Sequence, residues 1–233
     1  MELKNVNLLM NEKNVLRSIN LHWRQGESIA LIGANGAGKS SLLKVLSTLV
    51  KPSSGNIKYP VGISIRQWKE SLGIVFPETF LYDGLTGYEN LQFYQKLYGK
   101  VDKDGIAQVL EQVELSQVQH ELVSSYSKGM KQRLSIARAL VHYPTYFLLD
   151  EPFDGLDLAS KKILEDLLQQ MHKKGMSYVL VSHDTEHAWK LCDRALLMHK
   201  GSIVLEEKCT REGYLRFSNL YNTLFKENQH DIS

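Results

Sequence analysis

The sequence lacks the features that mark several classes of protein. Among 233 residues there are two cysteines, Cys192 and Cys209, without metal-ligand spacing, which favours a reducing cytosol over a disulfide framework. No apolar run approaches the roughly eighteen residues that cross a bilayer. The first residues also lack the long apolar core of a signal peptide. We therefore expect a cytoplasmic chain, and another chain must supply any membrane-spanning part.

The sequence also lacks a large excess of charge of either sign. The net charge of +2 gives no strong reason to expect nucleic acid or an anionic membrane as a partner. There is no internal repeat, long linker or low-complexity segment, and the apolar content of 43% is typical of a globular protein. The length suits one large domain, or a core with a subdomain, and we expect no nucleic acid partner.

A phosphate-binding loop is present. Residues 33–40 read GANGAGKS, between an apolar run (28–32) and a helix-forming segment (41–49), which matches the P-loop pattern. Glycines let successive N–H groups converge on phosphate, Lys39 adds a positive charge, and the Ser40 hydroxyl suits Mg²⁺. An ordinary glycine-rich turn is the alternative, and the complete motif between strand and helix argues against it. The residues expected to hold a nucleoside triphosphate are Gly33, Ala34, Asn35, Gly36, Ala37, Gly38, Lys39, Ser40 and Ser41.

Hydrophobic periodicity predicts the remaining elements. Alternating residues predict antiparallel strands in 1–24 and 56–65, and continuous apolar runs predict buried strands at 72–76, 146–149 and 178–181. Helical spacing and caps predict helices from Thr86 to Gly99, at 103–113, at 127–141 and between the last two buried strands. A hairpin at 195–205 and a helix at 214–225 complete the prediction.

Charged groups follow two of the buried strands. Asp150 and Glu151 close the strand 146–149, and ligands of parallel sheets bind beyond the carboxyl ends of strands. Adjacent side chains at a strand end point to opposite sides, so the two carboxylates have different roles. His183 follows the strand 178–181. The alternatives are an acidic pair that caps the next turn and a bystander histidine.

Five motifs occur in a fixed order along the chain. They are GANGAGKS (33–40), FPETF (76–80), YSKGMKQR (126–133), YFLLDEP (146–152), followed directly by FDGLD (153–157), and SHD (182–184). This order resembles the ATP-binding subunits of ABC transporters from end to end. It looks most like bacterial exporters whose ATP-binding subunit is separate from the membrane subunit, a group that includes multidrug, polysaccharide and haem exporters.

The resemblance implies an α/β fold. It consists of a P-loop NTPase core with a mainly parallel sheet, an antiparallel β subdomain and an inserted helical subdomain. Within a single domain of 1–233, we expect the core and β subdomain at 1–78 and 144–210, the helical subdomain at 79–143 and a C-terminal helix or tail at 211–233.

The resemblance also assigns roles in ATP hydrolysis. Asp150 holds the Mg²⁺ shell together with Ser40, Glu151 orients the attacking water as general base, and Lys39 and His183 act at the γ-phosphate. Glu78 stands where the family usually has Gln, and we expect it to reach Mg²⁺. Met10 stands where an aromatic residue normally stacks on adenine, so the choice between ATP and GTP stays open.

The motif around Ser127 occupies the slot of the family's signature loop, LSGGQ. Ser127 and Gly129 are kept, while Tyr126, Lys128 and Met130 replace Leu, Gly and Gln. An ordinary capped helix is the alternative. In the family this loop covers the ATP of a second subunit, so the resemblance implies a head-to-tail dimer on two Mg²⁺–ATP, with Asp157 along the interface.

The implied partners are a second copy or a homologous ATPase subunit, and an integral membrane permease. The chain would then lie on the inner face of the plasma membrane, with the helical segment 85–141 as lever arm and residues near 80–88 contacting the permease. Export is the favoured direction, and the transported substrate stays open. The alternatives are a non-transport ABC ATPase and a regulatory module that binds nucleotide without turnover. A P-loop kinase or GTPase finds no support, since no N-K-x-D motif occurs.

Overall fold

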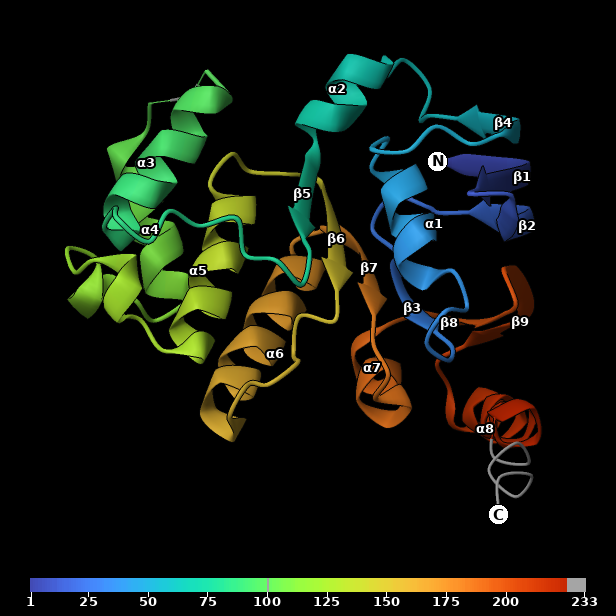
Figure 1. The fold of residues 1–233 in the computed structure, drawn as a ribbon. Coiled ribbons are helices and arrows are strands. Elements are labelled where there is room, and N and C mark those ends of the chain that lie inside the picture. Colours follow the sequence, from blue (N-terminus) through green and yellow to red (C-terminus); the bar gives the residue numbers. More distant parts are fainter. Residues whose placement is uncertain (100, 226–233) are drawn as a thin grey trace. The chain divides into compact units, whose positions relative to one another are not determined.

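The computed structural model describes residues 1–99 and 101–225 and divides the chain into two compact units (Figure 1). The first unit is built from Met1–Lys69 and Ser177–Ser233, and the second from Glu70–Met176. Residues 226–233 of the expected tail lie outside the described part. The boundaries 79–143 of the expected helical subdomain stay a prediction.

An antiparallel sheet opens the first unit. Strand β1 (Glu2–Met10) pairs with β2 (Lys13–His22) and with β4 (Ser54–Lys58), in the order β2-β1-β4. The alternating Leu3, Val6 and Leu8 of β1 are all buried, as period-two patterning predicts. The predicted antiparallel strands of the N-terminal region are therefore confirmed.

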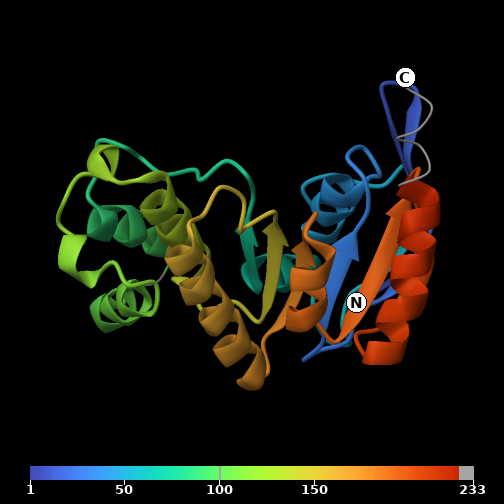
Figure 2. The ribbon, with the colours of Figure 1, turned by 90° about the horizontal axis from the view of Figure 1, so that it is seen from below.

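A second sheet in the first unit carries the P-loop. Strand β3 (Ser28–Ile32) pairs in parallel with β7 (Ser177–Val181) and with β8 (Arg194–His199), and β8 pairs antiparallel with β9 (Ser202–Lys208). Every residue of β3 and β7 is buried, which confirms the prediction from their continuous apolar runs. The helices of this unit are α1 (Lys39–Leu46), α2 (Ile65–Glu70, whose last residue belongs to the second unit), α7 (Thr185–Leu191) and α8 (Arg211–Phe225). Figure 2 shows α8 lying along β9.

One predicted strand is wrong over much of its length. The expected strand 56–65 ends at Lys58, and helix α2 begins at Ile65. Between them, the Ile63 N–H donates to the Pro60 carbonyl at 3.1 Å and Gly62 adopts a φ of 79°, which together form a tight turn. The Pro and Gly in this segment were the signal against a continuous strand. Helices α2 and α7 were not predicted.

The second unit combines two parallel strands with a group of helices. Strand β5 (Leu72–Val75) pairs in parallel with β6 (Tyr146–Asp150). The helices are α3 (Gly87–Leu97), α4 (Lys103–Gln112), α5 (Lys128–Leu140) and α6 (Leu158–Lys173), with short 3₁₀ turns at Ser116–Val118 and Val123–Ser125. Helices α3, α4 and α5 pack on one another, and α5 also packs on β5 and α6.

Local signals set the ends of helix α3 as predicted. The Thr86 hydroxyl accepts the Glu89 N–H at 3.1 Å, and the Glu89 carboxylate accepts the Thr86 N–H at 2.8 Å, which completes the expected capping box. The helix ends before Gly99, whose φ is 67°. Parallel strands, an antiparallel sheet and helices thus confirm the expected α/β class. Across the described residues, no helix has the length and apolar character needed to cross a membrane.

Candidate functional site

The P-loop connects the buried end of β3 to the first turn of α1. Gly38 precedes α1 with a φ of 102°, and a Cβ at this position would lie 2.9 Å from the Val15 carbonyl oxygen of β2. The Gly201 N–H of the β8–β9 turn donates to the Ala37 carbonyl at 3.0 Å. The loop is therefore held between β2 and the β8–β9 hairpin, in a backbone conformation that a side chain at position 38 would prevent.

Lys39 lies folded over this loop. Its Nζ donates to the Gly33 carbonyl at 2.7 Å and to the Ala34 carbonyl at 3.1 Å, and the residue is only 7% exposed. Ser40 and Ser41 follow in the first turn of α1, which contains no acidic residue. The loop backbone, the start of a helix and one buried ammonium group thus gather at one place, and this arrangement suits a polyphosphate.

His183 leaves the same edge of the sheet as the P-loop. Leu31 of β3 pairs with Val181 of β7 in parallel register, so Gly33 and His183 each follow the carboxyl end of neighbouring strands. His183 is exposed. Asp184, which follows it, caps helix α7 by accepting the His187 N–H at 3.0 Å. This cap gives Asp184 a structural role at the start of α7.

Met10 lies at the end of β1, in the hairpin that leads to β2. It pairs with Lys13 across the turn, and its side chain is exposed. The next strand, β2, reaches the P-loop at Val15, where the carbonyl faces Gly38. Met10 therefore stands on the element that borders the P-loop, and its thioether is available to cover an apolar ring face.

The two adjacent acidic residues of the second unit, Asp150 and Glu151, differ in exposure and in backbone conformation. Asp150 is the last residue of β6 and is 3% exposed, whereas Glu151 is partly exposed and has a φ of 49°. A left-handed conformation at a residue with a side chain costs on the order of 1–3 kcal/mol, and such strain concentrates at functional positions. Glu78 follows the neighbouring strand β5 and is exposed. These three carboxylates lie at or just beyond the carboxyl ends of adjacent parallel strands.

Ser127 and Gly129 begin helix α5. The Ser127 hydroxyl accepts the Met130 N–H at 3.2 Å and so caps the helix. A Cβ on Gly129 would lie 3.0 Å from the Ser160 hydroxyl of α6. Asp157 caps α6 by accepting the Ser160 N–H at 2.8 Å, and this hydrogen bond lowers the pKa of the Asp157 carboxyl. Gly129 and Asp157 therefore meet at Ser160.

Sequence reasoning did not predict the contacts that three residues of α5 make. The Lys128 ammonium lies against Gly155, in the segment between β6 and α6, and the Gln132 amide donates to the Pro152 carbonyl at 3.2 Å. The Lys131 ammonium pairs with Asp83 at 2.7 Å, in the segment between Glu78 and α3. The i, i+4 spacing of Lys128 and Gln132 was a signal that one face of α5 meets a single partner segment.

The structure thus brings the predicted residues together in two groups. The first unit holds the P-loop residues 33–41, His183 and Met10. The second unit holds Glu78, Asp150 and Glu151 after its strands, and Ser127, Gly129 and Asp157 at the starts of α5 and α6.

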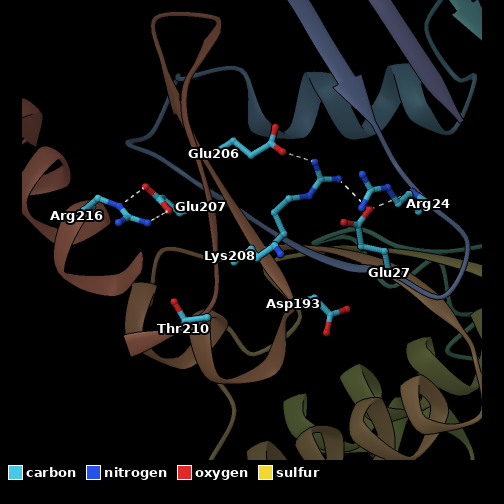
Figure 3. Close-up of a pocket in the computed structure, with 9 residues that line it drawn as sticks. Arg24, Glu27, Asp193, Glu206, Glu207, Lys208, Thr210 and Arg216 are labelled. Atoms are coloured by element: carbon cyan, nitrogen blue, oxygen red, sulfur yellow. Dashed lines mark hydrogen bonds and ion pairs between the residues drawn. The ribbon is translucent and has the colours of Figure 1, made fainter. Parts of the chain in front are cut away.

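A cavity of about 580 Å³ in the first unit is a separate feature (Figure 3). Arg194 pairs there with Glu27 at 2.8 Å and with Glu206 at 2.6 Å, and Arg216 pairs with Glu207 at 2.7 Å. None of the predicted site residues is among the described residues that line it. Since these charges neutralise one another, the cavity is part of the packing around β9 and α8.

Comparisons with known proteins agree on one family. Residues 16–154 match the family described as ABC transporter. The chain is 34% identical to the linearmycin resistance ATP-binding protein LnrL of Bacillus subtilis (strain 168), over 91% of this chain and 72% of that protein. It is also 34% identical to the bacitracin transport ATP-binding protein BcrA of Enterococcus faecalis, over 100% and 74%.

Solved structures show the same likeness. A dimeric ATP-binding cassette in a post-hydrolysis state, bound to ADP and Pi, superposes with a TM-score of 0.79 at 27% identity, over 90% of this chain and 98% of that one. The ATP-binding subunit of an ABC transporter gives a TM-score of 0.82 at 27% identity, over 94% and 93%.

Proposed function

The chain belongs to the ABC transporter ATP-binding family and is an ATPase, and from this premise we propose that it closes as a head-to-tail dimer on two Mg²⁺–ATP to drive a separate membrane subunit in export. The observation that carries the proposal is the pairing of a complete phosphate cradle with a strained carboxylate, Glu151, in one chain. A module that only binds nucleotide would need the cradle but not the strained carboxylate.

The P-loop residues 33–41 bind the phosphates in this proposal. Backbone N–H groups at the start of α1 face the β- and γ-phosphates, and Lys39 exchanges its carbonyl partners, Gly33 and Ala34, for phosphate oxygens. Met10 covers the base. Because a thioether contacts a purine face without reading its edge, we expect GTP to bind nearly as well as ATP.

Oxygen donors of this chain fit a magnesium ion. The Ser40 hydroxyl and the Asp150 and Glu78 carboxylates are the hard ligands that Mg²⁺ takes in proteins. The position of Asp150 supports this role, since it is the buried last residue of β6 and ligands of parallel sheets bind beyond the carboxyl ends of strands. Bound by these residues, Mg²⁺ would neutralise phosphate charge as the γ-phosphoryl group leaves.

Glu151 and His183 act on the reacting groups. Glu151 accepts a proton from the attacking water, and its left-handed backbone turns the side chain away from the direction that the strand would give it. His183 donates a hydrogen bond to the γ-phosphate from the strand end beside the P-loop. Together these two residues favour an ATPase with turnover over a regulatory module.

The second half of each site comes from the partner copy. Ser127 and Gly129 stand at the start of α5, with donors suited to the γ-phosphate of a nucleotide bound to another chain, and Asp157 lies along the shared interface. The dimeric state of a solved relative supports this assembly. ATP then acts as the ligand that shifts an open–closed equilibrium.

A permease completes the transporter. Exposed aromatic residues, Phe80 and Tyr82 among them, gather before α3 and supply a surface for a helix of the membrane subunit. The Lys131–Asp83 pair ties this segment to the helix that begins at Ser127. The chain then works from the cytoplasmic face of the plasma membrane. Two relatives are named for resistance to linearmycin and for transport of bacitracin, and both names support export.

A Glu151→Gln substitution tests the assembly. Without the general base, ATP stays bound and the closed dimer accumulates, so the variant should elute as a dimer with Mg²⁺–ATP and as a monomer with ADP, and its ATPase rate should fall at least about 10²-fold. Light scattering after gel filtration measures the mass. Glu165→Gln, on helix α6, is the matched control and should behave as the parent chain. A monomer at saturating Mg²⁺–ATP would contradict the head-to-tail dimer.

A further inference from the structure

The segment between β4 and α2, which Figure 1 shows as a ribbon, carries exposed apolar side chains. Val61 is fully exposed, at 104% of its reference area, and Ile65 in the first turn of α2 is 53% exposed. The sequence here is Pro60-Val61-Gly62-Ile63. A branched aliphatic side chain that is fully exposed at the tip of a turn contributes nothing to the core of its own unit, and its apolar surface is accessible to a partner.

This tip is firmly held at its base. The Ile63 N–H donates to the Pro60 carbonyl at 3.1 Å, and the Ser64 N–H donates to the Gln67 side chain at 2.9 Å at the start of α2. Tyr59 packs on Trp68 with ring centroids 5.8 Å apart. The fully buried Trp68 in turn donates its indole N–H to the Leu46 carbonyl at 2.9 Å. The exposed position of Val61 is therefore built into an ordered turn.

Cationic residues flank the tip in the sequence. From residue 28 to residue 69 the chain contains six lysines and arginines and no aspartate or glutamate, although the whole chain carries only +2. Three of these cations, Lys58, Arg66 and Lys69, flank the turn and are exposed. The neighbouring acids are Glu70, next in the chain, and Glu2, which stands opposite Lys58 in the sheet and pairs with Lys4 at 3.2 Å. The balance at this surface stays positive.

We propose that this basic–apolar tip, residues 58–69, docks on an anionic phospholipid surface. Val61 inserts between headgroups while Lys58, Arg66 and Lys69 lie at the level of the phosphates. A convex apolar point with cations around it matches a bilayer interface, which is apolar just below a negative layer. An apolar groove of a protein would match Val61 but not the cations, and an acidic protein surface would match the cations but not Val61.

Flotation of the full chain with lipid vesicles tests the proposal. The probes are vesicles of phosphatidylcholine alone and vesicles with 30 mol% phosphatidylglycerol, without nucleotide, so that the outcome is independent of ATP turnover and dimer closure. We expect binding to the anionic vesicles only, weakened by salt. Val61→Asp should reduce the vesicle affinity at least about tenfold, because a carboxylate at the tip opposes both insertion and the negative surface.

Matched variants separate the tip from general effects. Leu215→Asp changes an exposed leucine on α8, and this variant should bind as the parent chain. The double variant Lys58→Gln/Lys69→Gln should lose affinity by about fivefold per lysine, whereas Lys162→Gln/Lys190→Gln, with the same net charge, should not. A Val61→Trp variant should shift its fluorescence to the blue with anionic vesicles.

Three results would overturn the proposal. One is an absence of binding to anionic vesicles, and another is equal loss in the tip and control variants. The third is tip-dependent binding to native membranes that disappears in vesicles of pure lipid, which would assign the tip to a protein partner instead.

Discussion

The start of α1, in the first unit, differs from the starts of three helices of the second unit in the residue that precedes the helix. In the first unit, Gly38 precedes α1 and has no side chain to accept an N–H group of the first turn. In the second unit, Thr86, Ser127 and Asp157 each accept such an N–H group at the start of α3, α5 and α6. Helix α1 thus keeps its donors for a ligand, whereas the other three starts satisfy one donor within the chain.

The comparison shows why one half of the site is easy to recognise and the other is not. A glycine before a helix that follows a buried strand is a phosphate signal in itself. A serine cap is a common helix start, and only the family resemblance distinguishes Ser127 from Thr86. Yet a hydroxyl that accepts an N–H group still has its own O–H to donate, so Ser127 can cap α5 and bind a partner's γ-phosphate together.

The largest loss of ATPase activity should come from a substitution in α1, the helix whose start has no side-chain cap. Lys39→Ala removes the ammonium group that lies over the loop, and we expect the ATPase rate to fall by about 10²–10³-fold. Lys44→Ala is the control, because Lys44 is exposed on the same helix, and its rate should stay within about twofold of the parent. Steady-state phosphate release measures both. A comparable loss in the two variants would mean that α1 responds to any lost charge, and the special role of the P-loop lysine would be wrong.

The next effect separates two capping hydroxyls. Ser127→Ala and Thr86→Ala each remove a side-chain acceptor from a helix start in the second unit, so each should lower the free energy of unfolding by about 1 kcal/mol. Only Ser127→Ala should also reduce ATPase activity, by about 10²-fold, because only Ser127 contacts nucleotide in the proposed dimer. Urea denaturation and phosphate release give the two readouts.

The dependence of the ATPase rate on protein concentration tests the same contrast between Ser127 and Thr86. In the parent chain and in Thr86→Ala, the rate per molecule should fall as the protein is diluted, since each site needs a second copy. Equal ATPase loss in both variants, or a rate indifferent to concentration, would reduce Ser127 to an ordinary cap.

The sequence predicted those parts of the fold that depend on local pattern. The buried strands β3 and β7 follow from continuous apolar runs, and α3 follows from its capping box. The P-loop followed from a motif in which every position has a physical reason. The assignments of Glu78, Asp150, Glu151 and His183 rested on order and resemblance, and their roles stay predictions.

Other features depend on contacts that no local pattern reveals. The left-handed backbone of Glu151 depends on the turn that follows β6, where the Asp154 N–H donates to the Glu151 carbonyl at 3.2 Å. The contact of Lys128 with Gly155 joins residues far apart in sequence. The turn at Pro60 had the right punctuation, but the aromatic support from Trp68 that holds it came from tertiary packing.

The smallest effect concerns the charged cap of α6. The pKa of the Asp157 carboxyl lies below its usual range because the Ser160 N–H donates to its charged form. In the pH interval between this lowered value and the ordinary value near 4, the unfolded chain binds more protons than the folded chain, so stability rises with pH. The contribution of Asp157 is therefore complete at neutral pH and disappears as the pH falls through the folded pKa.

Asp157→Asn isolates that contribution. Asparagine caps a helix about as well as aspartate but does not titrate in this range, so the urea midpoint of the variant at pH 7 should stay close to that of the parent. Its urea midpoint should then fall less steeply than that of the parent between pH 5 and 3. Thr86 is the neutral comparison, because its hydroxyl caps α3 without titrating. Thr86→Ala should lower the urea midpoint, but the midpoint should fall between pH 5 and 3 as steeply as in the parent, since Asp157 is unchanged. If the urea midpoint depended on pH identically in the parent and in Asp157→Asn, the helix start would not stabilise the charged form of the Asp157 carboxyl. The neutral and charged caps of the second unit would then contribute to stability in the same way.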